Sequence, residues 1–191
     1  MDLLTILVKG GYLMIPIGIA SLIGVAIIIY KIGALKKLQT PKDMLIRLEE
    51  KIRANDREGI AQLCKIYECP ASRVILAGLE SKESMYATIG KEVTFAEMYL
   101  TGLATIAGIS PLLGFLGTVT GMIRAFMEVQ ALGGNVNASV LAGGIWEALV
   151  TTAAGLSVAI VMYIFYNYFV GKIKSFTQEL NAIASKIQAM K

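Results

Sequence analysis

Three apolar runs, each long enough to cross a lipid bilayer, constrain this chain more than any other feature. They cover Leu13–Tyr30, Leu103–Phe126 and Leu141–Val161, and about 20 apolar residues suffice for a transmembrane helix. The polar groups of the backbone must be bonded within each segment inside lipid, so these runs predict helices. We therefore expect an all-α polytopic membrane protein with three transmembrane helices, of which the second and third extend into the cytoplasm as long helices.

The basic residues are unevenly distributed, which predicts the orientation. Twelve of the eighteen Lys and Arg residues lie between Lys31 and Lys91, and four more follow Gly171. By the positive-inside rule both of these regions are cytoplasmic, and the N-terminus lies on the outer side. The expected segments are an outer N-terminal segment at 1–12, transmembrane helices at 13–30, 101–129 and 140–170, a cytoplasmic helical region at 31–100, an outer turn at 130–139 and a cytoplasmic C-terminal helix at 171–191.

Helical patterns continue outside the apolar runs. We expect helices after Pro41, after the cap residues Asn55 and Asp56, and from Pro70. Apolar residues from Ile89 to Leu100 keep helical spacing, which predicts one helix running straight into the second span. Apolar residues in the tail are spaced three and four apart: Ile173, Phe176, Leu180, Ile183, Ile187 and Met190. Such a seam needs a partner, which is either the chain's own helices or another copy.

Glu147 is the only charged residue in the third run. A carboxylate at that depth costs about 2.5–3.5 kcal/mol on insertion scales, so we expect it to have a partner or a function. Its helical neighbours Gly144, Thr151 and Gly155 are small or hydroxylated. They could line a polar passage or pack closely against another helix.

Several kinds of chemistry have no support in the sequence. The chain contains no His, and the spacing of Cys64 and Cys69 is poor for zinc. Acidic residues are mixed with the basic ones, as on a solvated helix surface and unlike a nucleic-acid interface. We expect no enzyme activity, no cofactor, no metal site and no nucleic-acid partner; the two thiols are expected to fill small apolar positions.

Two sequence stretches carry a resemblance to a known family. They are PLLGFLGTVTGMIRAF in the second run and GGIWEALVTTAAGLSVAI in the third, followed by Tyr166-Asn167. Together they resemble the ExbB/TolQ/MotA proton-channel family, most closely its ExbB and TolQ branch. The resemblance implies a multi-pass protein of the bacterial inner membrane with a periplasmic N-terminus, a periplasmic turn at 130–139 and a cytoplasmic C-terminus.

The resemblance also implies partners and an assembly. Five copies would form a homopentamer whose second and third spans line a pore. This pore would enclose two single-span helices of an ExbD- or TolR-like protein that carries an intramembrane Asp, and a TonB- or TolA-like protein would act downstream.

Three positions match the family motifs residue by residue. Glu147 matches the intramembrane glutamate, and Thr118 and Thr152 match two pore-lining threonines, so these three residues are the expected proton pathway. Arg124 stands where the family commonly has an uncharged residue, and we expect it to pair with Glu128 four residues further on. Thr118 is also open to the ordinary fate of a membrane threonine, a hydrogen bond to its own preceding helical turn.

The function implied is a channel or stator subunit of an ExbB–ExbD-like motor that uses the proton motive force to energise TonB-dependent outer-membrane transport. Two alternatives stay open: a TolQ-like subunit for envelope maintenance, and a passive oligomeric membrane scaffold. Coupling to sodium ions in place of protons is a further alternative.

Overall fold

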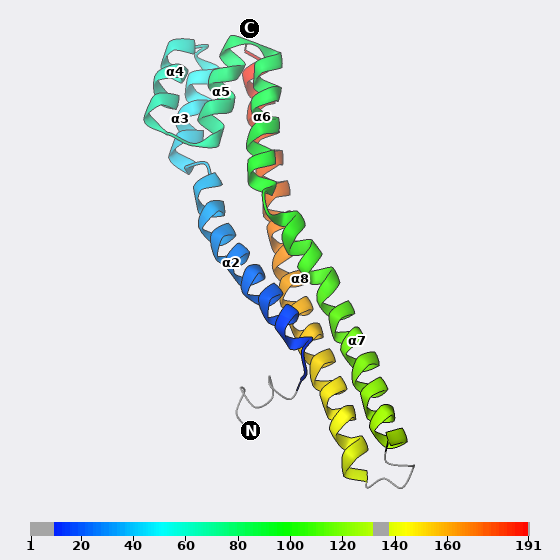
Figure 1. The fold of residues 1–191 in the computed structure, drawn as a ribbon. Coiled ribbons are helices and arrows are strands. Elements are labelled where there is room, and N and C mark those ends of the chain that lie inside the picture. The colour runs from blue at the N-terminus through cyan, green and yellow to red at the C-terminus, as the bar shows by residue number, and fades with distance from the viewer. Residues whose placement is uncertain (1–9, 132–137, 191) are drawn as a thin grey trace. The chain divides into compact units, whose positions relative to one another are not determined.

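The computed structural model describes residues 10–131 and 138–190, with side chains from residue 142 onward in the second range. These residues form helices and contain no strand (Figure 1). The helices are α2 (Met14–Leu38), α3 (Lys42–Arg53), α4 (Arg57–Ile66), α5 (Pro70–Glu80), α6 (Lys82–Glu97), α7 (Leu100–Ala131) and α8 (Ala138–Gln188). Among these described residues, three stretches are long and apolar enough to cross a membrane. The expectation of an all-α polytopic membrane protein is therefore confirmed, whereas most of the expected outer turn at 130–139 lies outside the described residues.

The chain divides into two compact units. The first, here called the span unit, comprises residues 1–28 and 99–167; the second, here called the bundle unit, comprises residues 29–98 and 168–191. Helices α2 and α8 are long enough to contribute one part to each unit.

Small residues set the distance between α7 and α8 in the span unit. A Cβ atom added to Gly155 of α8 would lie 2.5 Å from the carbonyl oxygen of Ser110, and one added to Gly144 would lie 2.5 Å from Cβ of Ala125. On α7, a Cβ at Gly121 would lie 3.0 Å from Cβ of Ala148. The backbones can approach this closely only because side chains are missing there. The glycine stripes seen in the sequence are thus packed against each other within one chain.

The first half of α2 also packs in the span unit. A Cβ at Gly24 would meet Sδ of Met162 on α8 at 2.4 Å, and Ile17 is almost fully buried. Ile15 and Leu22 are exposed, as expected for a helix side that faces lipid.

The bundle unit is held by α3 to α6 around an apolar core. The side chain of Asp56 accepts a hydrogen bond from the Gly59 N–H at 2.8 Å and caps α4, and Pro70 occupies the first turn of α5. Both expected helix starts are confirmed.

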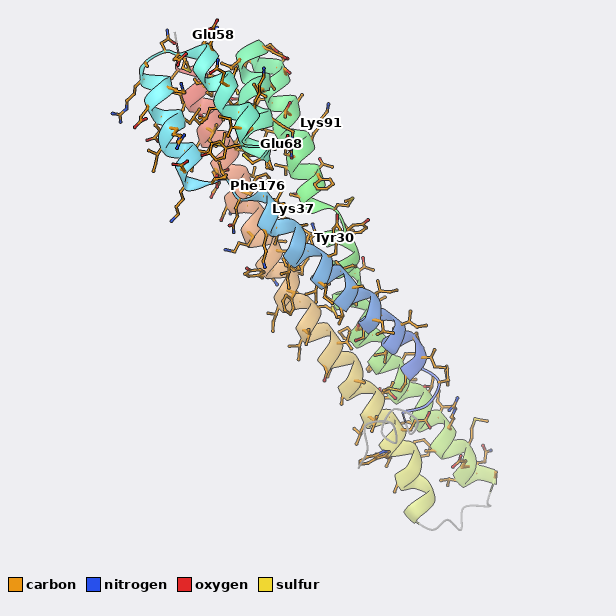
Figure 2. All side chains as sticks on the ribbon, turned by 90° about the vertical axis from the view of Figure 1, so that its left-hand side faces the viewer. Tyr30, Lys37, Glu58, Glu68, Lys91 and Phe176 are labelled. Carbon is orange, nitrogen blue, oxygen red and sulfur yellow. The ribbon has the colours of Figure 1, made fainter. Side chains whose placement is uncertain are left out.

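Charged residues lie on the surface of the bundle unit and apolar ones form its core. Figure 2 labels Glu58, Glu68 and Lys91, which are all exposed. The core residues include Met44, Leu48, Ile60, Leu63, Val74, Ile75, Met85 and Ile89.

The apolar seam of the tail is buried in the bundle unit of the same chain. Its buried members are Ile173, Phe176, Leu180, Ile183 and Ile187. A Cβ at Gly78 of α5 would lie 3.2 Å from Cγ2 of Ile187, and Lys186 donates a hydrogen bond to Glu49 of α3. Of the two expected partners for the seam, the structure therefore favours the chain's own helices.

The helix expected to run uninterrupted from Ile89 to Leu100 is broken. α6 ends at Glu97, Met98 is extended with φ −51° and ψ 136°, and Tyr99 has φ 67° before α7 begins. The carbonyls in the last turn of a helix lack helical partners. The buried ammonium group of Lys31 donates to the Ala96 carbonyl oxygen. Helical spacing could not reveal this break, because apolar residues keep the same pattern on both sides of it.

Candidate functional site

Glu147 lies on α8 with its side chain partly exposed, at 27%. Its Oε1 atom accepts a hydrogen bond from Nη1 of Arg124 on α7 at 3.1 Å. The antiparallel packing of α7 and α8 brings these two residues together, although 23 positions separate them in the chain. The carboxylate of the third apolar run thus has a positively charged partner within its own chain.

The turn before α2 covers Glu147 from a second side. Gly11 has φ +71°, and a Cβ there would lie 1.9 Å from Oε1 of Glu147. Both facts require glycine at this position, because an L side chain would be strained and would collide with the carboxyl group. One residue earlier, the carbonyl oxygen of Gly10 accepts a hydrogen bond from Oγ1 of Thr151 at 2.7 Å.

Thr151 and Tyr12 complete this cluster. The hydroxyl of Thr151 is buried and also lies 2.7 Å from the Glu147 carbonyl oxygen, so it links the turn to α8. The guanidinium group of Arg124 lies over the ring of Tyr12, 4.8 Å from its centroid, within the range of a cation–π contact. Arg124 therefore contacts both the carboxylate and the turn that covers it.

Thr152 and Thr118 lie apart from this cluster. Thr152 Oγ1 donates to the Gly114 carbonyl oxygen of α7 at 2.8 Å, whereas Thr118 Oγ1 donates to Phe115 in its own helix at 2.6 Å. Five residues separate Glu147 and Thr152, so their side chains leave α8 about 140° apart. Gly114 lies one turn before Thr118, so the structure brings Thr152 close to the level of Thr118 and leaves Glu147 on another side of α8.

Thr118 opens onto a shallow groove on α7. The groove has a volume of about 600 Å³ and is lined by Thr118, Val119, Met122, Ile123, Phe126, Met127 and Gln130. These residues all belong to α7, so the groove faces away from the helices of its own span unit and is open to a lipid or to another chain.

The expected pairing of Arg124 with Glu128 is corrected by the structure. Arg124 pairs with Glu147 instead, because the neighbouring helix presents a carboxylate to it, while the ion pairs found among the described residues do not include Glu128. Sequence reasoning also missed the contacts of Gly10, Gly11 and Tyr12. A signal for the ion pair was present: Arg124 and Glu147 lie at nearly equal distances along the chain from the middle of the expected turn at 130–139, so an antiparallel pair of helices folded there places them at similar levels.

The remaining titratable groups show no arrangement for a metal. Within residues 10–131 and 138–190, no group of three or more His, Cys, Asp or Glu residues could hold a metal ion. Cys64 and Cys69 are free and buried. Burial, together with the neighbouring Cys69, raises the pKa of the Cys64 thiol to about 11, so this thiol stays protonated and unreactive at neutral pH.

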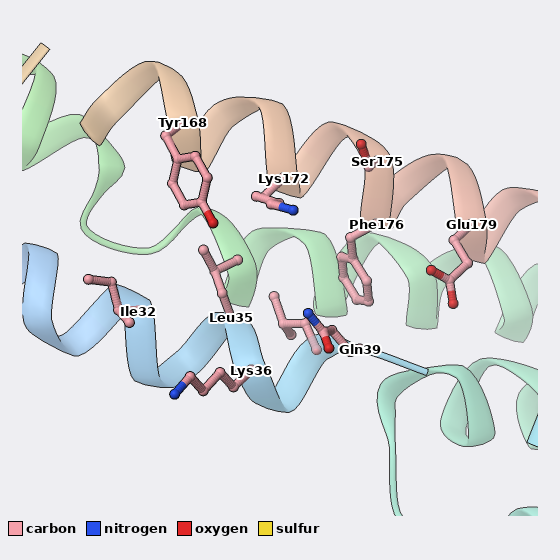
Figure 3. Close-up of a pocket in the computed structure, with 10 residues that line it drawn as sticks. Ile32, Leu35, Lys36, Gln39, Tyr168, Lys172, Ser175, Phe176 and Glu179 are labelled. Carbon is pink, nitrogen blue, oxygen red and sulfur yellow. The ribbon is translucent and has the colours of Figure 1, made fainter. Parts of the chain in front are cut away.

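A separate groove of about 370 Å³ lies in the bundle unit between the end of α2 and α8. In Figure 3, Phe176 reaches toward α2, whereas Lys36 points away from α8. The groove is mixed in character, with Leu35 and Phe176 beside Lys172 and Glu179. It contains none of the residues expected to form the proton pathway.

Comparison with known proteins decides the family. Residues 72–182 match the model of the MotA/TolQ/ExbB proton channel family. The chain belongs to this family. It is 34% identical to the ExbB-like 3 protein of Synechocystis over 171 residues, which cover 84% of this chain and 81% of that protein.

Other relatives agree with this assignment. An ExbB homologue of Methanothermobacter thermautotrophicus is 30% identical over 85% of this chain and 60% of its own length. The biopolymer transport protein ExbB of Salmonella typhimurium is 37% identical over 105 residues, which cover 55% of this chain and 41% of that protein. The expected family is confirmed, and within the expected ExbB and TolQ branch these relatives are ExbB-like. The family is one of channel proteins and not of enzymes. The matched residues include Thr118, Glu147 and Thr152, whereas Gly10, Gly11 and Tyr12 precede them.

Proposed function

We propose that this chain is the channel or stator subunit of an ExbB–ExbD-like motor in the bacterial inner membrane. The proton motive force would drive the motor, which would energise TonB-dependent transport across the outer membrane. The observation that carries the proposal is Glu147: it is the only charged residue in its apolar run, it lies in the family-matched region, and its side chain is still 27% exposed in the single chain. A second molecule can therefore reach the carboxyl group.

In this proposal five copies surround two single-span helices of an ExbD-like partner that carries an intramembrane Asp. Glu147 exchanges protons with that Asp, and carboxyl groups buried in membranes commonly form such relays. The groove on α7 beside Thr118 gives one open apolar surface for a neighbouring helix. The N-terminus would be periplasmic and the C-terminus cytoplasmic, which the distribution of Lys and Arg supports.

Thr118 and Thr152 would extend the proton route. Both hydroxyls already donate hydrogen bonds to backbone carbonyls. To relay a proton, each hydroxyl would accept one proton while releasing its own hydroxyl proton, or would first rotate away from its carbonyl. Thr152 joins α7 to α8, which gives its hydroxyl a packing role in addition to any role in the pathway.

The proposal is tested with Glu147→Gln, which keeps the size of the side chain and removes the titrating group. Gradient-driven transport should fall at least about a hundredfold, the scale of losing a proton-transferring group, while assembly and partner binding persist. The measurement is partner-dependent uptake in cells that lack the native subunit, with the amount of intact complex measured in parallel. Glu128→Gln is the matched control, because it removes an exposed carboxylate from α7 and should leave uptake unchanged.

Further arms of this experiment separate the alternatives. A TolQ-like subunit would restore envelope integrity and leave TonB-dependent uptake unrestored. Reconstituted vesicles driven by a proton or a sodium gradient would identify the coupling ion. Full activity of Glu147→Gln would contradict a proton relay and favour a passive scaffold.

A further inference from the structure

Arg124, Glu147 and the turn Gly10–Tyr12 form one connected cluster in the span unit. We propose that Arg124 and this turn act as a clasp that closes over Glu147 in each subunit, and that proton uptake by Glu147 opens it. The inference rests on the proposed function and adds to it a way in which a proton bound at Glu147 would change the shape of the subunit. Arg124 is then a positioning residue for Glu147.

The charges in the cluster give the clasp its dependence on protonation. Only Arg124 brings a charge to Glu147 among the described contacts: its Nη1 atom lies 3.1 Å from Oε1, Tyr12 faces Arg124 through its ring, and Thr151 is uncharged. Glu128, one turn beyond Arg124 on α7, forms no ion pair in the described part of the chain. Protonation of Glu147 removes the negative charge, and with it the Coulomb attraction that holds the guanidinium group.

The Arg124 side chain can move when this attraction is lost. Its side chain is 50% exposed in the single chain, so its neighbours within the chain leave the guanidinium group room to move away from the carboxyl group. Because Arg124 also holds the ring of Tyr12, its departure would loosen the turn. α2 begins at Met14, three residues after Gly11, so a change in the turn would reach the start of the first span.

Gly11 supplies a second, independent part of the clasp. Its φ of +71° and its contact with the carboxyl group leave no room for a side chain. Alanine at this position would push the turn away from Glu147 without altering any charge. Gly18, in contrast, lies inside α2 with nothing within 4 Å of an added Cβ, and Gly18→Ala is therefore a matched control.

Hydrogen–deuterium exchange of the complex in lipid nanodiscs measures the state of the clasp. The amides of Met14 and Ile15 donate to the carbonyls of Gly11 and Tyr12, so a peptide covering residues 11–17 reports on the turn. We expect this peptide to exchange about two to five times faster in Arg124→Gln and Glu147→Gln, the scale of losing a partly exposed ion pair. It should also exchange faster in Gly11→Ala, because the added Cβ displaces the turn. Arg124→Lys should be intermediate, and Glu128→Gln and Gly18→Ala should match the wild type.

The pH dependence separates the clasp from a merely structural contact. The ratio of exchange rates in Glu147→Gln and wild type, at each pH, cancels the intrinsic effect of pH on exchange. This ratio should fall toward one as the pH is lowered and the wild-type carboxyl group becomes protonated. A ratio that is the same at every pH would overturn the proposal, as would wild-type exchange in both Arg124→Gln and Gly11→Ala.

Gradient-driven uptake of the same variants distinguishes failure of the clasp from failure of the proposed function. We expect Arg124→Gln and Gly11→Ala to lower uptake several-fold. If Glu147→Gln loses uptake but exchanges like the wild type, the relay stands and the clasp is overturned. If Glu147→Gln keeps full uptake, the proposed function is overturned, and the clasp then loses its role in proton coupling.

Discussion

The free-energy cost of placing the Glu147 carboxylate in a membrane determines which neighbours it needs. A carboxylate at the centre of a bilayer costs about 2.5–3.5 kcal/mol on insertion scales, whereas a partly exposed ion pair contributes about 0.2–1 kcal/mol. The contact gives the carboxylate a partner, but Arg124 lies in an apolar run as well and brings an insertion cost of its own. Glu147 also lies beside Gly11, just before α2 begins, and charged side chains are penalised most at the centre of a span.

At the same scale, Cys64 gives a direct test of burial in the bundle unit. Its pKa is raised to about 11, first by burial and then by Cys69, so little thiolate exists at pH 8. Alkylation of Cys64 by iodoacetamide at that pH should be at least about tenfold slower than in denatured protein and should accelerate as the pH approaches 11. Mass spectrometry of the labelled peptide measures this, and equal rates in native and denatured protein would show that the thiol is exposed.

Among the elements, α7 and α8 depend on glycine more than any other described pair. Four glycines approach the facing helix so closely that a Cβ would lie within 3.0 Å of an atom there: Gly117, Gly121, Gly144 and Gly155. These contacts lie within one subunit, so the small-residue stripes are not free to join subunits. In the proposed pentamer, contacts between chains would use other surfaces, such as the groove on α7 beside Thr118.

This packing predicts the effect of a larger side chain at Gly121. Gly121→Leu should force α7 away from α8 and lower stability by at least about 1–3 kcal/mol, the usual cost of overpacking. Gly108→Leu is the control, since Gly108 lies on α7 with nothing within 4 Å of an added Cβ. The temperature at which the purified protein aggregates measures the difference. Equal temperatures for the two variants would contradict the close packing of these helices.

For the whole molecule, the span unit presents apolar side chains to its surroundings. Examples on its three long helices are Leu22, Leu112, Phe115, Leu149 and Ile160, all of which are at least half exposed. Lipid or other chains must cover this surface, because its contact with water is unfavourable. The homopentamer is the proposed arrangement, with lipid outside and the partner helices inside.

Native mass spectrometry tests this assembly. The protein released from gentle detergent should show five copies of the chain, and coexpression with an ExbD-like partner should add two copies of that partner. Closed rings of this kind use contacts that repeat around one axis. A monodisperse dimer under conditions that preserve other membrane complexes would contradict the pentamer.

Local patterns along the chain predicted the class of the fold and much of its layout. Apolar length predicted three spans because backbone groups in lipid must be bonded locally, and the cap at Asp56 and the start at Pro70 followed from local chemistry. The motifs around Thr118 and Glu147 predicted the family, since they are contiguous in the chain. The tail seam was visible as well, but its spacing could not distinguish the chain's own helices from another copy.

Contacts between residues far apart in the chain came from the packing of the helices. It replaced the expected contact of Arg124 with Glu128, four residues away in the same helix, by a contact with Glu147 on the facing helix. It also placed Gly11 against that carboxyl group and broke the helix at Met98 and Tyr99. The physical reason is the same in each case: helical spacing describes one element at a time, whereas an ion pair, a close approach or a break depends on what the packed neighbours present to it.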